Sequence, residues 1–136
     1  MTMRRIIPFF AAGALLAGCA HSGEQATEVP LGEKAQAALE KFEPVGTRSC
    51  INLRTVRSTR IADDTAIIYE VSGDRWFVNR PSGGRCSALQ PGRALVTRLT
   101  TGNLCSVDIV RVIDPPSPMD YGSCALGPFI EYRKKK

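Results

Sequence analysis

Three patterns of hydrophobic and polar positions follow one another along the chain. Residues 6–16 form an almost unbroken apolar run. Between residues 31 and 42, apolar side chains fall on one stripe of a 3.6-residue repeat, which predicts a short helix with Pro30 at its start and Pro44 after its end. We expect this stripe to pack on the domain that follows, and a helix that binds a partner is the alternative. From Cys50 onward the period is two, which is typical of half-buried strands.

The segment after Cys50 predicts a small β domain. Asp63-Asp64 and Ser72-Gly73-Asp74 supply turn signals between segments rich in β-branched and aromatic residues. These segments predict strands at 51–61, 66–71, 75–79, 94–100, 106–113 and 129–132. Because no second helical pattern appears, we expect a single all-β domain over residues 48–132, folded as an antiparallel sandwich or half-open barrel of five to six strands.

The apolar run at the N-terminus has the features of a secretory signal. Arg4 and Arg5 precede it, and eleven residues cover only about half of a ~30 Å hydrocarbon core, too few for a spanning helix. The run ends in Leu16-Ala17-Gly18-Cys19, which resembles the lipobox of bacterial lipoproteins. The resemblance implies that residues 1–18 are a signal peptide and that Cys19 carries lipid at the mature N-terminus. An ordinary signal whose cleavage discards Cys19 is the alternative.

The same resemblance predicts the location of the protein. Ala20 and His21 follow Cys19, and the lack of an acidic residue there implies sorting to the outer membrane, facing the periplasm. We expect the membrane to be a partner through the lipid on Cys19, because several acyl chains make attachment stable.

The net positive charge of the sequence comes from the two ends of the chain. The full sequence has a net charge of +5, which falls to +3 if Arg4 and Arg5 leave with the signal. Residues 133–136 form a basic tail, which either touches anionic head groups or wall polymers or remains solvated. Residues 19–47 are rich in glutamate and are expected to be a tether that contains the short helix. Because the domain between them is nearly neutral, we expect no nucleic-acid partner.

Four cysteines lie in the predicted domain: Cys50, Cys86, Cys105 and Cys124. In an oxidising envelope this number favours two disulfides. A zinc site is the competing explanation, but the domain has no Cys-x-x-Cys motif and no histidine. If the strands form a meander, Cys50 and Cys105 share one end of the domain. Cys86 and Cys124 then share the other end and form the second pair. A loop that crosses the end of the barrel would instead favour Cys86–Cys105.

Several short motifs resemble an uncharacterised family of small secreted or lipid-anchored proteins of Gram-negative bacteria, known as a domain of unknown function. The motifs are Cys50-Ile51-Asn52, Arg57-Ser58-Thr59-Arg60 followed by Asp63-Asp64-Thr65, Leu104-Cys105-Ser106-Val107-Asp108 and Cys124-Ala125-Leu126-Gly127-Pro128-Phe129. The resemblance implies an envelope location and a single domain. It brings no catalytic residue, cofactor or ligand.

The polar residues of the domain offer little catalytic chemistry. Asp63, Asp64 and Asp108 are expected to serve as turn or cap residues, and no histidine is available to activate a serine. Arginines are the unusual feature, since ten arginines and no lysine lie between residues 48 and 111. On an unbroken strand Arg54 and Arg60 would share a face that binds anions; a solvated sheet face is the alternative.

These observations predict a lipid-anchored envelope protein without enzymatic activity, a binding or structural module that needs neither cofactor nor metal. Its partner would be an envelope protein, a cell-wall polymer or lipopolysaccharide. An envelope hydrolase, or an accessory or inhibitor subunit of an enzyme, is the alternative.

Overall fold

The computed structural model describes residues 28–117 and 119–136. The predicted signal peptide and the lipobox cysteine therefore lie outside the described residues. No helix in the described part of the chain is long and apolar enough to cross a membrane.

The predicted short helix is present as α1 (Glu33–Leu39). It follows Pro30, and its apolar stripe is buried, with Ala35 fully inaccessible to solvent. Ala35 and Leu39 pack in one cluster with Ile68 and Val78 of the sheet. The prediction that the stripe packs on the domain is therefore confirmed.

The rest of the described chain is almost entirely antiparallel β structure, which confirms the predicted fold class. The strands are β1 (Phe42–Arg48), β2 (Cys50–Asn52), β3 (Ser58–Asp63), β4 (Ala66–Glu70), β5 (Arg75–Pro81), β6 (Ala94–Val96), β7 (Asn103–Cys105), β8 (Ile109–Ile113) and β9 (Asp120–Lys134). The main sheet has the order β3-β4-β5-β9-β8-β6, with β1 paired to β9. Strands β2 and β7 form a separate two-stranded ribbon.

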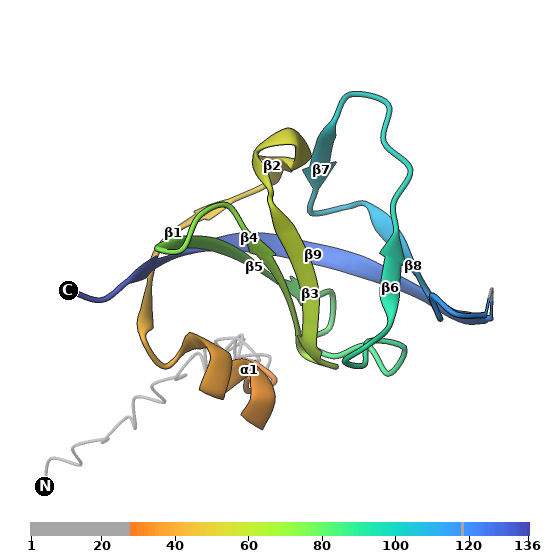
Figure 1. Ribbon diagram of the computed structural model, residues 1–136, viewed down its shortest axis with the longest axis horizontal. Coiled ribbons are helices and arrows are strands. Elements are labelled where there is room, and N and C mark those ends of the chain that lie inside the picture. The colour runs from red at the N-terminus through yellow and green to blue at the C-terminus, as the bar shows by residue number, and fades with distance from the viewer. Residues whose placement is uncertain (1–27, 118) are drawn as a thin grey trace, which may run out of the picture.

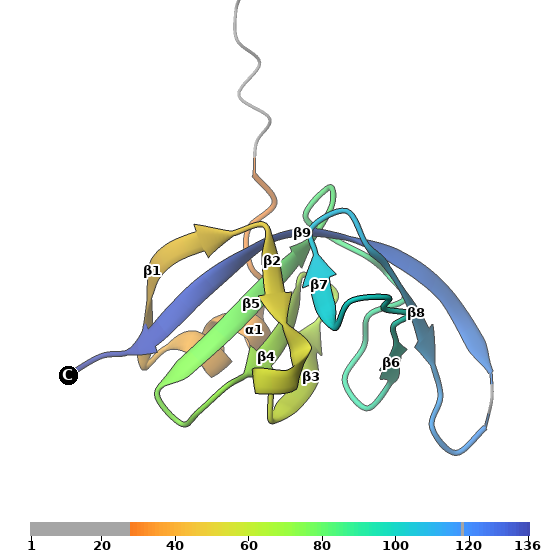
Figure 2. The same ribbon diagram turned by 90° about the horizontal axis from the view of Figure 1, so that it is seen from above.

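The long strand β9 organises the sheet. Its first part pairs with β8 from Asp120 to Ala125, and its second part pairs with both β5 and β1. Figure 2 shows β9 arching over the molecule, so that the strands on either side of it curl toward each other. This curvature turns the sheet into a half-open barrel.

Both predicted boundaries of the β domain were wrong. The sheet already begins at Phe42, inside the predicted tether 19–47, because β1 pairs with the end of β9. At the other end, the predicted basic tail continues β9. The amide of Lys134 donates to the Asp74 carbonyl and that of Lys135 donates to the Lys41 carbonyl, each at 2.9 Å. Backbone pairing thus extends the sheet through residues whose charges favoured a solvated tail.

Two buried clusters lie on opposite faces of the sheet. The inner cluster lies inside the curled sheet and contains Tyr69, Phe77 and Phe129. The outer cluster lies beneath α1, where Phe42 stacks on Trp76 with ring centroids 3.9 Å apart.

The preferred disulfide pairing is confirmed. Cys50 and Cys105 are direct partners across the β2–β7 ribbon, and Cys86 of the loop after β5 is bonded to Cys124 of β9. The simple meander behind that prediction was wrong, because β5 pairs with β9 and the β2–β7 ribbon stands apart from the main sheet. The paired cysteines nevertheless lie at shared ends of the domain.

Candidate functional site: the seam between β3 and β6

The barrel has a seam where its two end strands approach without pairing. Within the described residues, β3 is hydrogen-bonded only to β4, and β6 only to β8. Figures 1 and 2 both show β3 and β6 as neighbours on the side facing away from β9. The free edges of two strands therefore border the same opening.

A cleft of about 500 Å³ lies along this seam, and we call it the seam cleft. Its lining comes from η1 (Leu53–Thr55), β3, β4 and the segment around β6: Leu53, Thr59, Arg60, Ile61, Tyr69, Arg93, Ala94, Leu95 and Thr97. Its volume falls within the range of ~300–1,000 Å³ typical of ligand pockets. Like such pockets, it combines apolar walls with a few polar groups.

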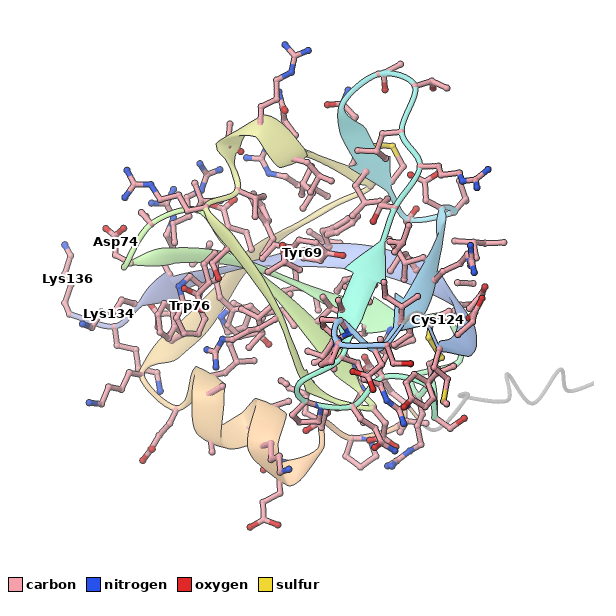
Figure 3. The ribbon with its side chains drawn as sticks, turned by 45° about the vertical axis from the view of Figure 1, so that its right-hand side comes forward. Tyr69, Asp74, Trp76, Cys124, Lys134 and Lys136 are labelled. Carbon is pink, nitrogen blue, oxygen red and sulfur yellow. A yellow bond between two sulfur atoms is a disulfide. The ribbon has the colours of Figure 1, made fainter. Side chains whose placement is uncertain are left out.

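Tyr69 is the most informative residue of the cleft. It occupies the centre of β4 opposite Thr59 and Phe77, and its ring meets the edge of Phe129. Figure 3 shows it in the middle of the molecule, and only 2% of its surface is exposed. Its hydroxyl has no hydrogen-bond partner among the described residues. Buried tyrosine hydroxyls normally have one, so an unpaired hydroxyl in a residue that lines the cleft marks this place as a candidate site.

Burial also defines the protonation state of Tyr69. Desolvation raises the pKa of its hydroxyl well above the ordinary value of 10.0. The group therefore remains an O–H donor throughout the physiological pH range and does not become a phenolate.

Arg93 is one of the two arginines among the residues that line the cleft. Its guanidinium lies 3.5 Å from the ring centroid of Tyr121 and donates to the Ala88 carbonyl at 2.8 Å. These contacts occupy one face of the Arg93 guanidinium and one of its N–H groups, so its other N–H groups can bind a ligand. No aspartate or glutamate is among the residues that line the cleft. The cleft thus favours hydrogen-bond acceptors and anions.

The strand face predicted to carry Arg54 and Arg60 does not form. The single strand expected over 51–61 is interrupted by η1, which contains Arg54, whereas Arg60 lies in β3. Asn52 causes this interruption, because its side chain accepts from the Arg54 amide. Arg60 pairs with Glu70 at 2.9 Å and lies over the ring of Trp76. Its charge is therefore largely engaged.

The aspartates singled out from the sequence make structural contacts. Asp63 accepts from the Ala35 amide and from Thr65, which ties α1 to the end of β3. Burial alone raises the pKa of Asp63, but these hydrogen bonds outweigh it and lower the pKa below its usual value. Asp64 pairs with Arg85, and Asp108 accepts from the Cys105 amide.

A buried carboxylate that sequence reasoning missed joins three strands. Glu131 of β9 is 7% exposed and pairs with Arg48 of β1, Arg75 of β5 and Arg133 of β9. Burial alone raises the pKa of Glu131, but the hydrogen bonds and charges of Arg75 and Arg133 outweigh it and lower the pKa. No local signal marks this cluster, because its members are distant in sequence.

Comparison with family models, curated proteins and solved structures found no match to this chain. The resemblance to the uncharacterised envelope family therefore stays a prediction. Within residues 28–117 and 119–136, no group of three or more histidine, cysteine or acidic side chains is arranged to hold a metal ion.

Proposed function

We propose that this chain is a lipid-anchored, non-catalytic binding module of the bacterial envelope, and that the seam cleft is its binding site. The observation that carries the proposal is Tyr69, which lines the cleft and whose buried hydroxyl has no hydrogen-bond partner among the described residues. An unpaired buried hydroxyl costs about 1–3 kcal/mol. A binding role accounts for the presence of the Tyr69 hydroxyl, which makes no hydrogen bond that would stabilise the described fold.

The chemistry of the cleft favours binding over hydrolysis. A hydrolase needs a general base or an activated nucleophile, usually a histidine or carboxylate. The lining offers hydroxyls and guanidinium groups instead. The raised pKa of Tyr69 makes its hydroxyl a donor and a poor nucleophile.

The lipid anchor would keep the cleft close to the membrane. Val29 already contacts the domain, since its carbonyl accepts from the Arg80 guanidinium, and Glu28 pairs with the same arginine at 3.5 Å. Glu28 follows Cys19 by only nine positions. A fully extended chain of that length spans about 30 Å, so an anchored domain could not move far from the bilayer surface.

The anchor is tested by fractionation of cells that express the full chain. We expect the wild type in the membrane fraction, with an acylated N-terminal peptide in mass spectra. The C19A variant should lose the acyl group and leave the membrane. A C19A protein that remains in the membrane to the same extent would contradict the anchor.

The binding site is tested with a photo-crosslinking residue placed in the full chain in living cells. Thr59 lines the cleft and Ser58 does not, because adjacent side chains of a strand point to opposite faces. We expect a discrete adduct from position 59 and none from position 58. Equal labelling at both positions, or no adduct at either, would contradict the proposed site.

A further inference from the structure

We propose that the occupant of the seam cleft is an extended polypeptide segment with an acidic side chain, which adds as a strand between β3 and β6. This inference rests on the proposed function and specifies its ligand. Its support comes from the strand edges, the strand directions and the chemistry of the lining.

The strand edges favour a peptide over other ligands. The edge of β3 that faces the seam belongs to a six-residue strand, and the edge of β6 to a three-residue strand. Neither edge has a neighbouring strand among the described residues. Unpaired strand edges are templates for another chain, and strand addition is a common mode of peptide recognition. A lipid chain or a sugar would fill the cleft but would not pair with both edges.

The strand directions predict the orientation of the peptide. Every hydrogen-bonded pair along the path from β3 to β6 is antiparallel, so these two end strands run in opposite directions. An inserted strand is therefore antiparallel to one and parallel to the other. Because β3 offers six residues and β6 three, pairing antiparallel to β3 gives the larger number of hydrogen bonds in the better geometry.

The lining predicts the composition of the peptide. Ile61 and Leu95 offer an apolar wall to side chains on the inward face of an added strand. The Tyr69 hydroxyl can donate to a peptide carbonyl or to a polar side chain. Arg93 and the lack of acidic lining residues favour an aspartate or glutamate and disfavour lysine or arginine. The expected ligand is thus an acidic segment with apolar or β-branched residues at alternate positions.

The experiment is a selection of random nonapeptides displayed on phage. The target is the full mature chain in nanodiscs of zwitterionic lipid, so that basic residues do not attract an anionic surface. Three proteins are compared: the wild type, T59W, which fills the cleft, and S58W, which places the same bulk on the other face of the strand. Circular dichroism and thermal unfolding of each variant confirm that it is folded.

We expect the wild type and S58W to enrich the same acidic, β-prone peptides. Binding of a synthetic copy, measured by fluorescence polarisation, should weaken at least tenfold in T59W. Methylation of alternate backbone nitrogens should weaken it by a similar factor, because a methylated nitrogen donates no hydrogen bond. R93Q, with its fold checked by the same circular dichroism and thermal unfolding, should lower the preference for acidic over amide-substituted copies.

Three results would overturn the inference. They are no enrichment relative to T59W, enrichment of basic peptides, and binding that is insensitive to backbone methylation. If in-cell crosslinking at position 59 gives a lipid or polysaccharide adduct while the display selection enriches nothing, the cleft remains the binding site and the peptide is excluded. If neither experiment gives a signal at the cleft, the proposed function fails as well.

Discussion

Removal of the Tyr69 hydroxyl should stabilise the domain. The Y69F substitution keeps the ring and its edge-to-face contact with Phe129, whose centroid lies 5.8 Å away, and removes only the oxygen. In the free protein that oxygen has no described hydrogen-bond partner and lies in a residue that is 2% exposed. The substitution therefore removes a desolvation cost without the loss of a hydrogen bond.

An unpaired buried hydroxyl costs about 1–3 kcal/mol. Because Tyr69 lines the cleft, we expect the lower end of that range, a gain of about 1 kcal/mol in the free energy of unfolding. For a domain of this size that gain corresponds to a rise in Tm of about 4 °C. Urea unfolding and calorimetry of the oxidised chain would measure both quantities. Affinity for a cleft ligand should fall at the same time.

The matched control is Y121F, which also removes one hydroxyl and keeps the ring beneath Arg93. Tyr121 is partly exposed, so its free energy of unfolding should change by less than about 0.5 kcal/mol. A loss of 1 kcal/mol or more in Y69F would refute the reasoning, because it would mean that the hydroxyl is already paired within the fold.

Four further predictions concern the framework of the barrel. Replacing Glu131 by alanine leaves its three arginine partners facing one another and should lower the free energy of unfolding by about 2 kcal/mol in urea unfolding, whereas a neutral effect would contradict its bridging role. D63A should cost about 1 kcal/mol and increase amide exchange in α1; unchanged exchange would contradict the cap. The pKa values of the Asp63 and Glu131 carboxyls are both lowered, so their stabilisation is complete above pH ~5 and is lost as the pH falls further; equal stability at pH 6 and pH 3 would contradict this. Loss of the Cys86–Cys124 bond in a double alanine variant should cost about 2–4 kcal/mol by calorimetry, and an unchanged Tm would contradict its role as a staple.

The local pattern of apolar and polar residues was sufficient to predict the elements whose contacts are close in the sequence. The hairpin of β4 and β5 was predicted because alternating residues flank Ser72-Gly73-Asp74, and the structure pairs Tyr69 with Phe77 across it. The disulfides were predictable for a different reason. With four cysteines only three pairings exist, and the ends of the strands limit the choice.

Pairing between strands that are distant in the sequence could not be predicted in this way. β1 contains Pro44 and Gly46 with a register shift between them, so its sequence is typical of a helix stop and a loop. Its partner β9 ends in basic residues. Their charged, exposed side chains are typical of a solvated tail and give no sign that the backbone is paired. Neither strand has a clear signal without the other, because each is stabilised by a contact about ninety residues away.

The candidate site depends on the same long-range arrangement. Tyr69 has the pattern of an ordinary core residue in the sequence, and Arg93 lies in a segment whose path is set by β8. Only the curl of the sheet brings β3 and β6 together and places a hydroxyl between them. The electrostatic prediction for Arg54 and Arg60 failed for a local reason, since one turn after Asn52 separates them.

The central claim is that the barrel is open at the seam and accepts a partner there. Solution NMR of the full mature chain tests this most directly, through nuclear Overhauser contacts between β3 and β6. If the seam is open, we expect no cross-strand Hα–Hα contacts between residues 59–61 and 94–96, with fast exchange of the edge amides until a ligand is added. Strong contacts between these residues in the free protein, with protected amides, would show a closed barrel and contradict the account.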